Sequence, residues 1–180
     1  MTIQKQLYTL EEFVQFALLP ENSEREFELI NGRIVEKLPG TTRNSELALM
    51  ISFEVRLFCR EHNIPCHTSG AAGAYQVGIH VLVPDFAYKR TSMSNDYPDP
   101  VAPEWAVEVI SQPDKVGDIR AKKMLYLQAG ILYWELYPED RSVDAYAPGQ
   151  PMRTYRADDL VDLGDLIPGF TLALKDIFEP

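Results

Sequence analysis

The sequence predicts a single α/β domain over residues 1–180. The chain length suits one domain with a sizeable core and leaves little room for a second. Hydrophobic residues make up 46% of the chain and charged residues 24%, which is the balance of a globular protein rather than a disordered one. Amphipathic segments with helical spacing are interspersed with short apolar runs bounded by turn residues, and this pattern indicates that helices and strands are mixed along the chain.

Composition and charge exclude several classes of protein. No apolar run approaches the roughly 20 residues that span a bilayer, and the N-terminus has no apolar signal-peptide core. With only two cysteines, nothing indicates a disulfide scaffold, so we expect a soluble cytoplasmic protein with no membrane partner. The formal net charge of -10 argues against a protein that coats nucleic acid by general attraction, although a local basic patch could still meet DNA.

Three helices are predicted, the first two from apolar positions that recur at steps of three and four. The first begins after Thr9, where a glutamate three residues later completes a capping box. The second spans about residues 45–62, with Asn44 as its cap. The third spans about residues 118–129 and is stopped by Gly130.

A β-hairpin is predicted between the first two helices. Asn31-Gly32 separates two apolar runs, residues 27–30 and 33–36, and this dipeptide favours a tight turn in which both residues have positive φ. That turn places Glu28 opposite Val35 on one face of the sheet.

Further strands are predicted from apolar runs bounded by turn residues, and a segment rich in Ser, Asp and Pro at residues 91–103 reads as a linker. The apolar C-terminal segment at residues 166–172 should close the domain. The predicted strands cover residues 74–80, 81–88, 105–110, 131–137 and 142–146.

Two acidic residues lie inside strands that otherwise read as core. Alternation places Asp85 on the face of Val83, and it places Glu108 on the face of Ala106. A buried, unpaired carboxylate costs several kcal/mol, so we expect a cation beside these two residues, with Mg²⁺ or Mn²⁺ best suited to a site of hard oxygen ligands. The alternative is structural: Asp85 accepts backbone amides at a strand end, and Glu108 pairs with an arginine.

A stripe of side chains at steps of four residues follows these strands, at Asp114, Asp118, Lys122 and Tyr126. It reads either as a solvated helix face with an Asp118–Lys122 pair or as a face from which Lys122 reaches over the metal site. If DNA binds, its backbone should run along the compact basic cluster of Lys115, Arg120, Lys122 and Lys123.

Several of these segments, taken in order, resemble the Uma-two family of proposed restriction endonucleases, within the PD-(D/E)XK nuclease superfamily. The resemblance runs from about Tyr8 to Phe178. It implies a restriction-endonuclease-like core with a mixed β-sheet flanked by helices, metal-dependent hydrolysis of phosphodiester bonds, and often a homodimer. The matching segments are residues 27–35, 83–86, 107–111, the positions 118, 122 and 126, and residues 129–131, 133–134 and 167–170.

The resemblance also implies roles for individual residues. Asp85 corresponds to the motif aspartate and Glu108 to the motif acid, and both would bind Mg²⁺ or Mn²⁺. Glu28 matches an early glutamate of the family and could complete the metal shell, as could the carbonyl group of Val109.

The motif lysine is expected two residues after the motif acid, but Ile110 stands there. The resemblance implies that the lysine is displaced onto the following helix, where Lys122 matches and Lys123 is the near rival. Lys122 would orient the attacking water or stabilise the transition state.

The sequence therefore predicts a Mg²⁺- or Mn²⁺-dependent endonuclease that acts on DNA, and two alternatives stay open. One is a catalytically inactive nuclease-fold module that binds nucleic acid or a protein partner. The acidic charge favours it, as does Asn44 or Ser45 where the family has a histidine. The other is a dimeric scaffold whose carboxylates pair with internal arginines such as Arg33.

Overall fold

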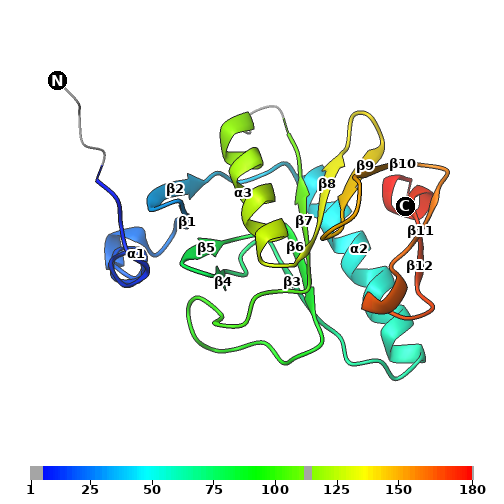
Figure 1. The fold of residues 1–180 in the computed structure, drawn as a ribbon, viewed down its shortest axis with the longest axis horizontal. Coiled ribbons are helices and arrows are strands. Elements are labelled where there is room, and N and C mark those ends of the chain that lie inside the picture. The colour runs from blue at the N-terminus through cyan, green and yellow to red at the C-terminus, as the bar shows by residue number, and fades with distance from the viewer. Residues whose placement is uncertain (1–5, 112–114, 180) are drawn as a thin grey trace.

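A mixed six-stranded sheet forms the centre of the protein in a computed structural model, which describes residues 6–111 and 115–179. Its strand order is β10-β9-β8-β7-β6-β3; β7 and β8 are parallel, and the other neighbours are antiparallel. The predicted α/β class is confirmed (Figure 1). The strands are β3 (His67–Gly70), β6 (Phe86–Lys89), β7 (Trp105–Val109), β8 (Leu132–Tyr137), β9 (Ser142–Tyr146) and β10 (Arg153–Arg156).

Two helices cover the two faces of this sheet. The longer, α2 (Thr42–Glu61), shares its core with apolar side chains of β6, β7 and β8. The other, α3 (Val116–Gln128), packs on the opposite face through Leu125 and Tyr126. Among the described residues, no helix is long and apolar enough to cross a membrane.

A second, four-stranded antiparallel sheet carries the predicted hairpin and has the order β2-β1-β5-β4. The hairpin prediction is confirmed: Asn31 and Gly32 have φ of 51° and 71°, and Glu28 pairs with Val35. The helix α1 (Leu10–Ala17) begins at the predicted capping box and packs on this sheet. The strands are β1 (Glu26–Ile30), β2 (Arg33–Lys37), β4 (Tyr75–Val77) and β5 (His80–Leu82).

The C-terminal region packs on the α2 side of the six-stranded sheet, with apolar residues of the region in the same core as α2. Its elements are the strands β11 (Leu160–Asp162) and β12 (Thr171–Ala173) and the helix α4 (Leu174–Phe178), with a 3₁₀ turn, η2 (Gly164–Leu166). A further 3₁₀ turn, η1 (Pro20–Asn22), follows α1.

The prediction of one strand over residues 81–88 is wrong. The chain leaves the smaller sheet after β5 and enters the larger sheet at β6, so Asp85 lies in the connection between the sheets. Pro84 has no amide proton to donate to a neighbouring strand, which explains the break at this point. The predicted strand 74–80 is likewise divided, because the chain turns at Gly78, where φ is 63°.

The start of α2 and the presence of β3 also differ from the predictions. The second helix begins three residues earlier than expected, because the side chain of Thr41, rather than Asn44, caps it by accepting the amide of Asn44. Strand β3 was not predicted; its polar sequence, His67–Gly70, has no apolar alternation.

Alternation along β7 decides which of its residues face the functional site. Trp105 and Val107 belong to the core beneath α2. Ala106 belongs to the core beneath α3, so Glu108, two residues on, shares that side of the sheet. The prediction that Glu108 shares a face with Ala106 is therefore confirmed.

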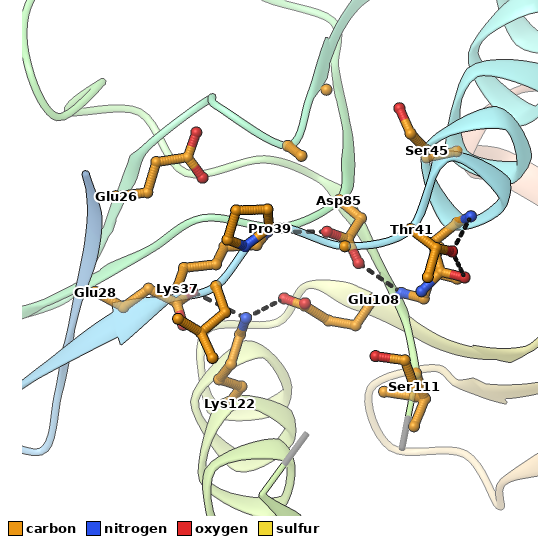
Figure 2. A pocket seen from close by; sticks show the side chains of 18 of the residues that line it. Glu26, Glu28, Lys37, Pro39, Thr41, Ser45, Asp85, Glu108, Ser111 and Lys122 are labelled. Carbon is orange, nitrogen blue, oxygen red and sulfur yellow. Dashed lines mark hydrogen bonds and ion pairs between the residues drawn. The ribbon is translucent and has the colours of Figure 1, made fainter. Parts of the chain in front are cut away.

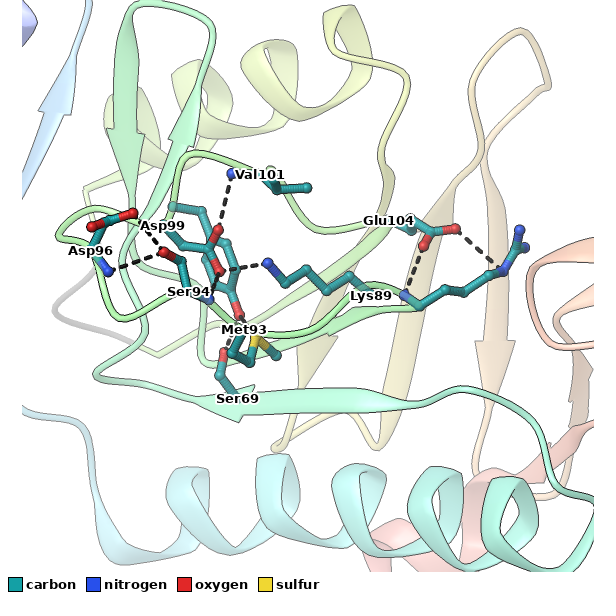
Figure 3. A network of polar contacts seen from close by, with 10 residues as sticks. Ser69, Lys89, Met93, Ser94, Asp96, Asp99, Val101 and Glu104 are labelled. Atoms are coloured by element: carbon teal, nitrogen blue, oxygen red, sulfur yellow. Dashed lines mark hydrogen bonds and ion pairs between the residues drawn. The ribbon is translucent and has the colours of Figure 1, made fainter.

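The polar linker at residues 91–103 is held against the large sheet by a buried ion pair (Figure 3). Lys89 is 1% exposed, and its Nζ lies 2.5 Å from Oδ2 of Asp99. Asp99 also accepts the backbone N–H groups of Ser94 and Val101. Burial alone would raise the pKa of Asp99, but the contacts with Lys89 and these amides outweigh it and lower the pKa.

We predict that Asp99→Ala lowers the free energy of unfolding by about 3–5 kcal/mol, because it leaves the Lys89 ammonium buried without a counter-ion. Asp96→Ala, at an exposed position of the same linker, should change it by less than about 0.5 kcal/mol. Urea unfolding of both variants checks this. Since the folded-state pKa of Asp99 is lowered, its contribution is present at neutral pH and is lost as pH falls. The difference in the free energy of unfolding between wild type and Asp99→Ala should therefore shrink in acid. If Asp99→Ala and Asp96→Ala lose the same free energy of unfolding, this account is contradicted.

Candidate active site

A pocket of about 680 Å³ lies between the two sheets, beside the N-terminal halves of α2 and α3. It is lined by the four side chains that the sequence singled out for chemistry (Figure 2), and by Val109, whose carbonyl group was a fifth candidate. Three elements and one connection supply them: β1 for Glu28, the β5–β6 connection for Asp85, β7 for Glu108 and α3 for Lys122. The structure thus gathers residues that are up to 94 positions apart in the sequence.

The Lys122 ammonium group lies between two carboxylates. Its Nζ is 2.8 Å from Oε1 of Glu28 and 2.6 Å from Oε1 of Glu108. All three residues are at most 8% exposed. Tyr126, one helical turn after Lys122, directs its hydroxyl to Glu108 at 3.4 Å. The helical spacing therefore places Lys122 over the carboxylate of Glu108 on β7.

Backbone amides orient two of the carboxylates. The N–H of Val83 donates to Oε1 of Glu28 at 2.8 Å, and the N–H of Val109 donates to Oδ2 of Asp85 at 2.7 Å. The structural interpretation of Asp85, as an acceptor of backbone amides, is therefore correct for one of its two oxygens.

The other oxygen of Asp85 contacts a lysine that sequence reasoning missed. Lys37 Nζ lies 2.9 Å from Oδ1 of Asp85 and 2.6 Å from the carbonyl oxygen of Val83. The sequence could have predicted this position. Strand alternation places Lys37 on the face of Val35, and the hairpin register pairs Val35 with Glu28. A second missed contact lies further along the sheet, where Lys123 is 3.3 Å from the buried Glu135.

Burial and charge act in opposite directions on this cluster. Burial raises the pKa of Glu108, and the nearby charges of Lys122 and Lys37 offset only part of that effect. Burial alone would lower the pKa of Lys122, but the charges of Glu108 and Glu28 outweigh it and raise the pKa. The site therefore holds a protonated lysine, Lys122, beside the carboxyl group of Glu108. Any additional cation nearby would stabilise the ionised form of Glu108.

The donor set of the pocket fits a hard divalent cation. Asp85 and Glu108 supply carboxylate oxygens, and each of the two lysine ammonium groups already bridges a pair of oxygens, as a metal ion would. Within the described residues, no group of three or more His, Cys, Asp or Glu side chains is arranged to hold a metal ion. In this arrangement Glu28 serves as a partner of Lys122, which leaves Asp85 and Glu108 as the candidate pair for a cation.

Two sequence predictions about the surrounding charges are wrong. Asp118 pairs with Arg33 at 3.1 Å rather than with Lys122, because Lys122 turns inward to the buried carboxylates. Arg33, the example that the scaffold alternative named, therefore pairs with Asp118 and not with Asp85 or Glu108. Asp114 lies outside the described residues.

The basic cluster predicted to follow a DNA backbone is also not a single surface. Lys122 is buried, and Lys123 pairs with Glu135. Lys115 and Arg120 are exposed, and Lys115 lines the pocket.

Comparison with known proteins finds a family profile and solved structures that match this chain. The family profile Uma2, described as "Putative restriction endonuclease", matches residues 10–175. A crystal structure from Anabaena variabilis ATCC 29413, described as "a putative nuclease belonging to DUF820", is similar over 94% of this chain and 97% of that one, with a TM-score of 0.77 and 22% sequence identity. Among curated proteins, none matches the sequence significantly. The structural likeness supports the fold.

We predict that Lys122→Met lowers the free energy of unfolding by about 3–5 kcal/mol, because Glu28 and Glu108 would lose their shared buried counter-ion. Lys123→Met is the matched control on the neighbouring position. Its partner Glu135 also accepts hydrogen bonds from Tyr137 and Tyr146, so the loss should be smaller. Urea unfolding of both variants measures the difference. If Lys122→Met loses no more free energy of unfolding than Lys123→Met, the role of Lys122 as the shared counter-ion of Glu28 and Glu108 is contradicted.

Proposed function

The chain belongs to the Uma2 family of restriction-endonuclease-like proteins, and we propose that it is a metal-dependent endonuclease that hydrolyses phosphodiester bonds in DNA. The observation that carries this proposal is that Asp85, Glu108, Glu28 and Lys122 line one pocket, with Lys122 between the two glutamates. A structural salt bridge would need one buried acid for Lys122, whereas Lys122 has two, and a third carboxylate, that of Asp85, lines the same pocket and pairs with Lys37.

Asp85 and Glu108 would hold Mg²⁺ or Mn²⁺, which when bound lowers the pKa of a water molecule and offsets charge on the scissile phosphate. The amide of Val109 fixes one oxygen of Asp85 and leaves the other toward the pocket. The carbonyl group of Val109 is proposed as a further ligand, since Val109 lines the same pocket.

Lys122 is proposed to orient the attacking water or to stabilise negative charge on the phosphate in the transition state. Glu28 acts through Lys122: it holds the ammonium group in place and is itself held by the amide of Val83. Because Lys122 has two carboxylate partners, it can keep Glu28 when Glu108 turns toward a cation.

DNA is the proposed substrate because the fold and the site together suit a phosphodiester. The exposed Lys115 at the pocket wall can contact a substrate phosphate. With a net charge of -10, affinity for DNA should depend on a few such local contacts. A homodimer stays a prediction from the family resemblance.

One observation favours a second candidate function, a module that binds nucleic acid or a protein partner without cleaving. In the cluster, Asp85 and Glu108 each already contact a lysine, so the site is partly neutralised without a metal. The two functions differ in whether the pocket supports hydrolysis.

We predict that the protein cleaves DNA in the presence of Mn²⁺ and that Asp85→Asn reduces the rate by about 100-fold or more, since removing a metal ligand costs at least as much as removing its supporting residue. Circular and linear DNA, in single- and double-stranded form, should be incubated with each protein and the products resolved on gels. Asp144→Asn is the control, because Asp144 lies in β9 of the six-stranded sheet, outside the pocket, and accepts a hydrogen bond from Thr154. Its rate should equal that of wild type.

Calorimetric titration with Mn²⁺ separates the two candidate functions. Binding that is lost in Asp85→Asn, with no cleavage of any DNA form, would favour the non-catalytic module. If the wild-type protein neither binds Mn²⁺ nor cleaves any DNA form, the proposed function is contradicted.

A further inference from the structure

We propose that Lys37 is a built-in counter-ion of Asp85 which a divalent cation displaces, so that Lys37 sets the metal affinity of the pocket. This inference rests on the proposed function, because it concerns the same carboxylates. It assigns a role to a residue that neither the sequence patterns nor the family resemblance singled out.

The contacts of Lys37 are those of a cation at a metal ligand. Its Nζ lies 2.9 Å from Oδ1 of Asp85, the oxygen that the amide of Val109 leaves free. The same Nζ lies 2.6 Å from the carbonyl oxygen of Val83. A metal ion bound to Oδ1 of Asp85 would be repelled by the ammonium group at the same oxygen, so Lys37 weakens metal binding for as long as it stays there.

Lys37 and Lys122 differ in how firmly they are held. Lys122 has two buried carboxylate partners and a side chain that is 9% exposed. Among the described residues, Lys37 pairs with one carboxylate, Asp85, and its other contact is a neutral carbonyl group. The contact with Asp85 is therefore the one that a competing cation breaks more easily.

The position of Lys37 allows it to move. It is the last residue of β2, which is an edge strand of the smaller sheet, and its side chain is 15% exposed and lines the pocket. Its side chain can turn into the pocket by rotation about its own bonds, with the backbone pairing of β2 to β1 unchanged.

The charge of the cluster supports the exchange. When all are ionised, the carboxylates of Glu28, Asp85 and Glu108 and the ammonium groups of Lys37 and Lys122 have a net charge of -1. A divalent cation changes this to +1. A phosphodiester carries one negative charge, so the ammonium group displaced from Asp85 remains in the pocket as a positive charge that suits this substrate.

The experiment is calorimetric titration of the full chain with MnCl₂, without DNA, so that the readout is metal affinity. Lys37→Met should bind Mn²⁺ about tenfold or more tightly than wild type, which corresponds to about 1.4 kcal/mol. Lys37→Arg keeps the charge and should bind like wild type. Lys115→Met removes a positive charge from the same pocket wall without touching Asp85, and its affinity should change by less than about threefold.

Thermal unfolding gives an independent readout. Without metal, Lys37→Met should unfold at a lower temperature than wild type, because Asp85 loses its counter-ion. Saturating a tighter site stabilises the folded state more, so Mn²⁺ should raise the unfolding temperature of Lys37→Met more than that of wild type at equal concentration. Should Lys37→Met fail to fold, Lys37→Gln provides a second neutral side chain for both measurements.

The outcomes distinguish this inference from the proposed function. Binding by wild type that depends on Asp85, with equal or weaker binding by Lys37→Met, overturns the inference and leaves the function standing. If Lys115→Met gains as much Mn²⁺ affinity as Lys37→Met, the inference is overturned as well. The gain would then come from the loss of any positive charge at the pocket, and not from the contact between Lys37 and Asp85. No Mn²⁺ binding by any of the proteins overturns both.

Discussion

The buried ammonium group of Lys122 is the interaction on which the rest of the site depends. It joins α3 to β1 of the smaller sheet, through Glu28, and to β7 of the larger sheet, through Glu108. Removing three charged groups from water is costly, and the arrangement is stable only because each charge has a close partner and further hydrogen bonds. The amide of Val83 and the hydroxyl of Tyr126 supply those bonds. The packing of the two sheets and the geometry of the site are therefore held by the same atoms.

The two lysines of the pocket, Lys122 and Lys37, therefore have different roles. Lys122 is buried on a helix and keeps the carboxylates of β1 and β7 at a constant separation. Lys37 lies on an edge strand, has weaker contacts, and touches the carboxylate that lies in the connection between the sheets. In the site that we propose, Lys122 would be the fixed part and Lys37 the part that an entering cation displaces.

The local parts of this arrangement were predictable from sequence, and the long-range parts were less so. Asn31-Gly32 determines the hairpin register, and strand alternation places Glu108 beneath α3, because both depend on neighbouring residues alone. The position of Asp85 was mistaken for a strand interior, since an apolar run does not reveal that Pro84 marks a change of sheet. Helical spacing gave the side of α3 on which Lys122 lies, but its partnership with Glu28, across 94 residues, depends on tertiary packing. Lys37 was missed although the register contained it, because a lysine at the end of a strand is usually solvated.

The central claim is that Asp85 and Glu108 together bind a divalent cation in the pocket that Lys122 organises. Crystals of the protein soaked in Mn²⁺, with anomalous diffraction recorded at a wavelength where manganese scatters anomalously, test it most directly. The account predicts an anomalous peak between the carboxylates of Asp85 and Glu108, with Lys122 still in contact with Glu28. A peak at another place in the protein, with Lys37 and Lys122 unmoved on Asp85 and Glu108, would contradict it.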